Sequence, residues 1–383
     1  MRLPLASALA GLVLALHLAV APPLVRAEDG APTPGPITEW MAWYYLFPAP
    51  DRVGDFLAWL AAEKTLAKRP AAAVATGAFL APIFAAHPDR VAAWVDPKIV
   101  TAEAREAAAF GLWLAGRADL ARDLYGDLPK AATAAPPDLK TRRPATPLDV
   151  DTQWAAFMAD GDAAHIRLIV DALDDQIPLD DDRTVEKKTR AAAAWSLSAN
   201  VLLHERVARL LAAEATTRRP PVAKALTTLL SDSRRAVKPF PVHDGDFSGL
   251  VLVVDASNLS TFQKPANEAI AVDRVARVER DRKVALKAVF MGQQLTDDLV
   301  SDVTWDVTIT DPTGKRWSEG DLIGLEGLKG RIPSRWRVFD SRGFPTLWFT
   351  ADDAPGVYTI RSVVRDNVSG RSLTFDDTIE YVK

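Results

Sequence analysis

The sequence has 383 residues, and its 46 Lys and Arg against 50 Asp and Glu give a formal net charge of −4. With 48% hydrophobic and 25% charged residues, it has the composition of a soluble globular protein, which excludes a disordered, collagen-like or polytopic membrane chain. The length predicts two domains, and the absence of cysteine excludes disulfides, thiolate metal sites, iron–sulfur clusters and cysteine nucleophiles.

Residues 1–27 have the layout of a secretory signal peptide. Arg2 precedes an apolar run from Leu3 to Ala21, and Val25-Arg26-Ala27 places small residues at the outer positions of a cleavage site. We therefore predict cleavage after Ala27. The alternative is an uncleaved membrane anchor, because about 18 apolar residues are enough to span a bilayer.

The predicted mature chain is exported and mildly acidic. Removing the two arginines of the signal leaves 44 basic against 50 acidic residues, a net charge of −6. That charge argues against a nucleic-acid binder. We expect residues 28–36 to form a disordered leader and the protein to be periplasmic or secreted, in an envelope of the Gram-negative type.

Residues 37–232 predict an all-helical domain, since they are rich in alanine, leucine and arginine and show no period-two alternation. Four breaks, near Phe84, Trp113, Phe157 and Leu197, each separate an apolar helix end from an amphipathic helix. Such units resemble helical hairpins that stack into a solenoid-like slab with a concave binding side. Their uneven spacing leaves an irregular all-helical domain as the alternative.

Two features of this helical region could bind ligands or could be structural. The first is an acidic cluster around Pro178, which lacks the spacing of a calcium loop and is better explained by a helix end followed by an aspartate N-cap. The second is an aromatic run that could stack on sugars but is better explained as core. Their residues are Asp171, Asp174, Asp175, Asp180, Asp181 and Asp182, and Trp40, Trp43, Tyr44, Tyr45, Phe47, Phe56 and Trp59.

Residues 233–247 have the composition of a linker, and residues 248–383 predict a β domain. The strand Val303–Ile309 alternates apolar and polar residues, and Asp311–Gly314 then forms a turn. Similar strands follow on both sides of a turn at 367–370. Short alternating strands of this kind favour an antiparallel sandwich.

The stretch 353–358 resembles the tyrosine corner of immunoglobulin-like domains, with Tyr358 bonding back across the preceding bend and Trp305 buried in the opposing sheet. As a whole, Phe262–Gly292, Val303–Gly314 and Gly356–Val382 resemble the carboxy-terminal region of uncharacterised bacterial exported proteins, in which a helical domain precedes an immunoglobulin-like β-sandwich. The resemblance extends loosely to 195–200. It implies an α+β multidomain architecture and no known activity.

The residues that usually carry chemistry are scattered. No two of His87, His165, His204 and His243 are spaced as zinc ligands on one helix. The stretch 245–249 has its serine one position too late for a hydrolase elbow. The glycines from Gly320 to Gly330 are interpreted as a long loop rather than a phosphate cradle, and the basic residues from Arg274 to Lys283 as the protective charges of an edge strand.

We therefore assign no catalytic, cofactor-binding or metal-ligating residue, and no cofactor. The favoured hypothesis is a non-catalytic exported module that binds another envelope protein or peptide. One alternative is an envelope glycan or peptidoglycan hydrolase with acids in the helical region. Another is a carbohydrate-binding protein that uses Trp40, Trp43 and Tyr44.

Overall fold

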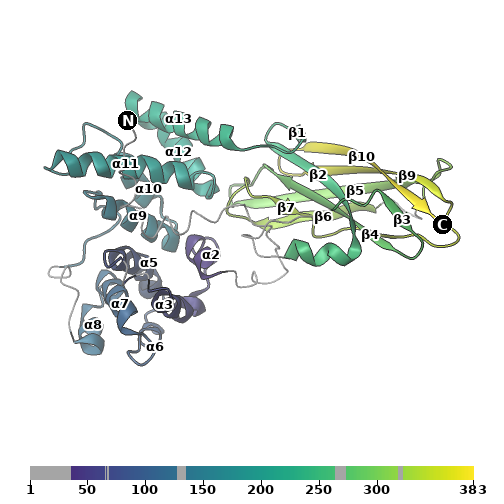
Figure 1. Cartoon of the computed structure of the whole chain (residues 1–383). Coiled ribbons are helices and arrows are strands. Elements are labelled where there is room, and N and C mark those ends of the chain that lie inside the picture. The colour runs from purple at the N-terminus through teal and green to yellow at the C-terminus, as the bar shows by residue number, and fades with distance from the viewer. Residues whose placement is uncertain (1–35, 65, 67–68, 127–134, 264–272, 318–321) are drawn as a thin grey trace, which may run out of the picture. The chain divides into compact units, whose positions relative to one another are not determined.

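The computed structural model of the chain describes residues 36–64, 66, 69–126, 135–263, 273–317 and 322–383. It confirms an α+β arrangement, in which helices are followed along the chain by two β-sheets (Figure 1). The predicted signal peptide lies outside the described residues. Within the described ranges, the structure contains no helix with the length and apolar character needed to cross a membrane.

The described residues form two compact units. The helical unit contains 36–201 and Val207–Ser233, and the β unit contains Leu202–Arg206 and Arg234–Lys383. The expected linker at 233–247 holds the end of the last helix and the whole of the first strand.

The helices occupy the purple-to-teal part of the chain in Figure 1. They are α2 (Ile37–Ala42), η1 (Pro50–Arg52), α3 (Val53–Ala62), α5 (Ala72–Ala86), α6 (Val91–Trp94), α7 (Ala102–Leu114), α8 (Ala118–Tyr125), α9 (Pro147–Asp160), α10 (Ala163–Asp171), α11 (Arg183–Asn200), α12 (Glu205–Thr217) and α13 (Pro220–Ala236).

Helix ends lie where the sequence predicts breaks. The helices α5, α7, α9 and α11 end at Ala86, Leu114, Asp160 and Asn200, which matches the four predicted positions. At the other end of α9, the Thr146 side chain accepts from the Asp149 amide while Asp149 accepts from the Thr146 amide. This reciprocal capping satisfies amides that the first helical turn would otherwise leave unpaired.

The core of the helical unit depends on the close approach of α5 and α7. A Cβ added to Gly77 on α5 would lie 2.4 Å from Phe110 Cβ on α7, so only glycine allows this contact. Buried aromatic rings fill the neighbouring space, with Trp40 and Phe79 at 5.4 Å between centroids. The helix α5 has no charged residue along its whole length, which is typical of a helix buried on most sides.

The β unit contains two sheets. One has the order β1-β2-β4-β7, with β8 also paired to β4, and the other has the order β3-β10-β9-β5-β6. The strands are β1 (Val242–Asp244), β2 (Phe247–Asp255), β3 (Arg277–Glu279), β4 (Lys283–Met291), β5 (Val300–Thr310), β6 (Leu322–Arg331), β7 (Phe339–Asp340), β8 (Thr346–Trp348), β9 (Gly356–Asp366) and β10 (Arg371–Val382), with the 3-10 helix η2 (Ala256–Gln263) after β2.

The predicted strand alternation is confirmed on β5, where buried and half-buried residues alternate along the whole strand. Trp305 is fully buried, and its indole Nε1 donates to the Gly343 carbonyl at 2.9 Å. The turn predicted after β5 is also present, because the Asp311 amide donates to the Lys315 carbonyl. The alternation of apolar and polar residues in the sequence therefore correctly predicted which face of β5 is buried.

Three expectations about the β region are wrong. Trp305 does not lie in the sheet opposite Tyr358, because its strand β5 pairs with β9, the strand of Tyr358, within one sheet. The strands are not all antiparallel, because β3 pairs with β10 in parallel; a parallel neighbour needs no tight turn when a long stretch of chain separates the two strands. The glycines Gly324, Gly327 and Gly330 do not form a loop but lie on β6. Glycine is tolerated there because β6 is an edge strand with register shifts against β5.

The segment Leu202–Arg206, which ends in the first turn of α12, belongs to the β unit. Within that unit, the buried Glu205 forms an ion pair with Arg335, which also donates to Gln294 Oε1 at 3.0 Å. The Glu205 amide donates to the Pro333 carbonyl at 2.7 Å. Residues 202–206 therefore complete the β unit although its strands begin at Val242.

We expect Tyr358→Phe to destabilise the β unit by about 0.5–1.5 kcal/mol, the usual net value of one hydrogen bond. The phenol is buried and donates to the Ala354 carbonyl at 2.9 Å, which is the contact that the tyrosine-corner resemblance predicts. Urea unfolding of the two proteins measures the difference. Equal stability would mean that water replaces this hydrogen bond without loss.

Candidate functional site

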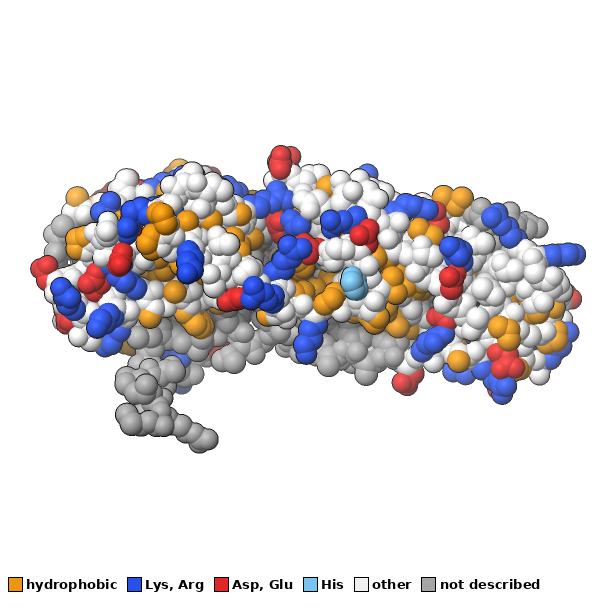
Figure 2. Space-filling model, turned by 90° about the horizontal axis from the view of Figure 1, so that it is seen from above, with side chains coloured by type: hydrophobic (Ala, Val, Ile, Leu, Met, Phe, Trp, Pro, Cys, Tyr) orange, Lys and Arg blue, Asp and Glu red, His pale blue; other side chains and the backbone are white. Residues whose placement is uncertain are grey.

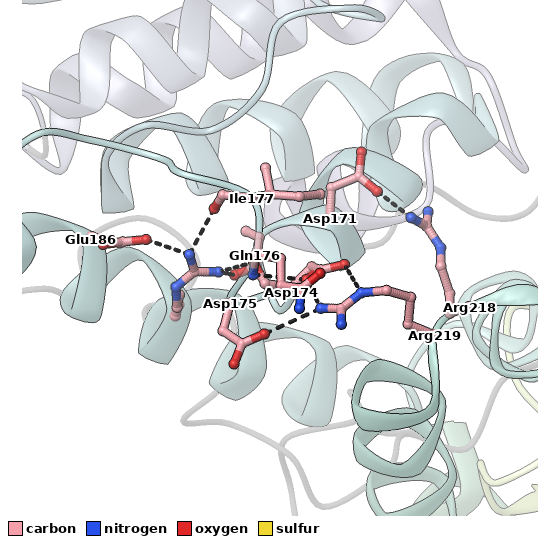
Figure 3. Close-up of polar contacts among 10 residues, drawn as sticks. Asp171, Asp174, Asp175, Gln176, Ile177, Glu186, Arg218 and Arg219 are labelled. Carbon is pink, nitrogen blue, oxygen red and sulfur yellow. Dashed lines mark hydrogen bonds and ion pairs between the residues drawn. The ribbon is translucent and has the colours of Figure 1, made fainter.

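Three aspartates of the acidic cluster, Asp171, Asp174 and Asp175, form ion pairs with arginines (Figure 3). Arg218 pairs with Asp171, and Arg219 pairs with Asp174 and, at 3.2 Å, with Asp175. The hydrogen bond from Arg219 is the main cause that lowers the pKa of Asp174 to about 2. These carboxylates are therefore held as ion-pair partners and are not arranged to receive a metal ion.

Arg190 on α11 binds backbone carbonyls of the same acidic segment. Its guanidinium donates to the carbonyls of Ala172 at 2.9 Å and Ile177 at 2.7 Å, and it pairs with Glu186 one turn earlier on its own helix. Side chains that bind the last carbonyls of a helix act as carboxy-terminal caps. The predicted aspartate N-cap is also confirmed, because the Asp182 side chain accepts from the Thr184 amide.

The aromatic run at the start of the helical unit is mostly core. Trp40 and Tyr44 are buried and meet edge to face at 5.4 Å, so their rings are not available to stack on a sugar. Trp43 and Tyr45 are half-buried. The interpretation of this run as a contribution to the core is confirmed for its buried members.

The histidines of the described residues do not take part in a metal-binding cluster. His165 is buried, and its Nδ1 lies 2.7 Å from Gln153 Oε1 while its Nε2 lies 3.4 Å from Asp160 Oδ2. Because the Gln153 amide donates to two backbone carbonyls, its oxygen is left to accept from His165. In the part of the chain that the structure describes, no group of three or more His, Asp or Glu could hold a metal ion.

Asp151, unlike the paired aspartates of the acidic cluster, lies in a partly buried environment without a counterion among the described residues. Asp151 on α9 is half-buried, and burial raises the pKa of its carboxyl to about 7. No described residue forms a hydrogen bond or ion pair with it. It lies one turn before Ala155 on the helical stripe that continues to Met158 and packs into the core.

A second polar group without a partner lies one turn along the same helix. The indole Nε1 of Trp154 is buried and has no hydrogen-bond partner among the residues that the structure describes. The Trp154 ring is fully enclosed and meets Phe157 edge to face at 6.0 Å between centroids. Buried polar atoms are nearly always bonded, so an exception needs an explanation. Asp151 and Trp154 together, which we call the α9 site, are the candidate functional site.

Sequence reasoning missed the α9 site. The signal that could have found it is the stripe Asp151, Ala155 and Met158, in which a carboxylate occupies an apolar position at helical spacing. Acidic residues in such positions are rare unless they are paired, and strongly shifted pKa values are concentrated at functional sites.

We expect Asp151→Asn to stabilise the protein at about pH 8, by roughly 1–3 kcal/mol. The folded pKa of Asp151 lies above the ordinary value of about 3.9, so the folded state binds its proton more tightly than the unfolded state does. The contribution of Asp151 to stability is therefore present below about pH 4 and is lost as the pH rises to about 7.

Urea unfolding followed by circular dichroism at a series of pH values tests this expectation. The control is Asp123→Asn, which changes an exposed aspartate on α8 in the same way. The stability difference between Asp151→Asn and the unmodified protein should widen between about pH 4 and pH 7, whereas the control should show no such widening. A difference that is constant with pH would contradict the buried environment of Asp151.

The described residues on the face shown in Figure 2 offer no second candidate of comparable specificity. On the face seen in Figure 2, positive and negative side chains are interspersed and hydrophobic side chains form scattered groups. Such a surface does not carry the single-sign patch that a polyanion binder needs.

The sequence matches no family model and no curated protein. Among solved structures, it is similar to a family 123 glycoside hydrolase from Clostridium perfringens, with 10% identity, a TM-score of 0.23 and coverage of 36% of this chain and 27% of that chain. The chain thus aligns with about a quarter of the hydrolase.

Two further solved structures are similar at the same level. A Niemann-Pick type C2 protein from Japanese carpenter ant has 10% identity and a TM-score of 0.22, over 36% of this chain and 91% of that one. The Pseudomonas fluorescens alkylpurine DNA glycosylase AlkC, bound to DNA containing an abasic site analog, has 9% identity and a TM-score of 0.21, over 77% and 82%. At these scores no property of the three proteins is transferred to this chain.

Proposed function

We propose that the protein is an exported, non-catalytic module of the bacterial cell envelope that binds another envelope protein or peptide. The observation that supports this proposal is the α9 site, where a half-buried carboxylate has no partner among the described residues. A group that lowers stability in the isolated protein is expected where function requires it. Binding of a partner would supply the missing interaction.

The proposed architecture serves this function. The helices of 37–232 form a repeat-like stack with a binding side, and residues 248–383 form an immunoglobulin-like sandwich that offers a second surface. The breaks at the predicted helix ends and the hydrogen bond of Tyr358 support these two assignments.

The alternative is an envelope glycan hydrolase, and Asp151 is also the observation that favours it. A general acid works best when its pKa is near the working pH, and burial raises the pKa of Asp151 to about 7. Glycosidases usually need a second carboxylate at the scissile bond. Asp151 itself has no hydrogen-bond or ion-pair partner among the described residues.

Purified full-length protein incubated with peptidoglycan, soluble glycans and envelope peptides separates the two proposals. We expect retention of an envelope peptide without product formation, and weaker retention by Asp151→Asn than by the control Asp123→Asn. Product formation that Asp151→Asn abolishes, while unfolding and circular dichroism stay unchanged, would replace the binding function by the hydrolase.

Export has its own test. We expect the mature chain to begin at Glu28, because Ala27 ends the small-residue cleavage site and a permissive residue follows. Intact mass of the protein recovered from the periplasmic fraction measures this. Recovery of the whole apolar segment in the membrane fraction would contradict cleavage.

A further inference from the structure

The 3-10 helix η2 covers an apolar part of the first sheet of the β unit. It packs against β2 and β4, with Leu259 and Phe262 as its apolar contacts. The strand residues of this cluster are Leu250, Leu252 and Val254 on β2 and Ala285 and Val289 on β4. A Cβ added to Gly249 would lie 3.2 Å from Leu373 of the second sheet. Because side chains alternate along a strand, the cluster therefore lies on the face turned away from that sheet.

Side chains, rather than backbone pairing, hold η2 on this face. In the described part of the chain, no backbone hydrogen bond joins η2 to β4. The helix is also eight residues long, whereas 3-10 runs longer than about four residues are uncommon because their hydrogen bonds have poor geometry. A segment that lacks backbone pairing to its neighbours opens at a lower free energy than strands inside a sheet.

A buried charge lies on the same apolar face. Lys287 of β4 is opposite Leu252 and only 4% exposed, and its ammonium group pairs with Asp340 and donates to the Ser341 carbonyl. Both partners are fixed to β4, since β7 pairs with that strand and the Ser341 amide donates to the Ala288 carbonyl at 2.7 Å. The position of the charge is therefore set by the sheet and does not depend on η2.

Phe262 connects η2 to this charge. The Lys287 Nζ lies 5.5 Å from the centroid of the Phe262 ring and 4.5 Å from that of Phe344, which lies outside η2. An aromatic ring attracts an ammonium group placed over its face, and the attraction is stronger where water is excluded. A leucine in place of Phe262 would keep the apolar contact and lose this attraction.

We propose that η2 is a cover that opens as a unit while both sheets stay folded, and that the contact between Phe262 and Lys287 keeps it closed. Opening would expose the apolar residues of β2 and β4 beneath η2, so the β unit would gain a transient apolar surface. The proposal concerns the β unit alone and is independent of the α9 site and of the proposed binding function.

Native-state hydrogen exchange of the full-length protein at low urea concentrations tests the opening. The amides of η2 should exchange together and faster than those of β9 and β10. Their rates should change little with urea, because a local opening exposes little surface. The proposal is overturned if the η2 amides exchange as slowly as those of β9 and β10 with the same dependence on urea, or if they exchange independently of one another.

Phe262→Leu tests the contact that closes the cover. We expect the η2 amides to exchange about 5- to 30-fold faster in this variant, with β9 and β10 unchanged. The matched control is Phe344→Leu, which removes the other ring from the same ammonium group but leaves η2 intact, and exchange of η2 should stay within about twofold. Equal acceleration in both variants, or acceleration of β9 and β10 together with η2, would contradict the proposal.

Lys287→Met separates the charge from the volume of the ring. Methionine keeps a long apolar side chain beneath Phe262 and removes the ammonium group. Acceleration of η2 exchange relative to β9 and β10, as in Phe262→Leu, supports Lys287 as the group that holds the cover. Unchanged η2 exchange in Lys287→Met would overturn that role.

Discussion

Gly292→Ala is expected to destabilise the β unit by about 4 kcal/mol or more, enough to leave it largely unfolded. Gly292 follows β4 with φ of +76°, and an added Cβ would lie 1.8 Å from the carbonyl oxygen of Asp246. The clash is with backbone, which cannot rotate away as a side chain can. Circular dichroism and urea unfolding of the variant measure the loss.

The matched control is Gly314→Ala in the turn after β5. Gly314 has a similar φ of +87°, but an added Cβ would meet no atom within 4 Å. The Gly314→Ala change should therefore lower the stability of the β unit by only about 1–2 kcal/mol, the cost of placing a non-glycine residue at positive φ. Similar losses in both variants would show that the backbone around Asp246 moves to make room.

Trp305→Ala is expected to cost about 3–5 kcal/mol, the usual loss for a large buried aromatic side chain. The ring is fully buried on β5, and removing it also leaves the Gly343 carbonyl without its donor. The change should appear as a lower urea midpoint with the β signal still present at low denaturant.

Trp348→Ala gives the comparison for the same residue type. Trp348 lies on the edge strand β8 and is 52% exposed, so its truncation should change stability by less than about 1 kcal/mol. If Trp305→Ala proved no more damaging than Trp348→Ala, the assignment of Trp305 to the core would be wrong.

Local patterns in the sequence predicted local structure well. The alternation around Trp305 gave the buried face of β5, and Asp182 gave the start of α11. In both cases the cause lies within a few residues, since period two and N-capping depend only on near neighbours. The turn after β5 was predicted for the same reason.

Features that depend on distant residues were not predicted. The acidic cluster was visible, but Arg219, which pairs with Asp174, lies 45 residues further along the chain. The glycines of β6 predict a loop, and the sequence does not show that their strand lies at a sheet edge. The α9 site was missed because one acid in an apolar stripe becomes notable only when its surroundings are known.

The position of β10 determines when the strands of the second sheet can pair. This strand lies between β9 and β3, and Arg277 on β3 meets Glu380 on β10 across 103 residues of chain. A chain that emerges amino end first leaves β3 without a neighbouring strand until residues 371–382 have also emerged, because no other described strand pairs with β3. The second sheet is therefore completed late. A chain that ended before Arg371 would leave β3 without its neighbour and β9 with one unpaired edge, and both strands could then pair with other molecules.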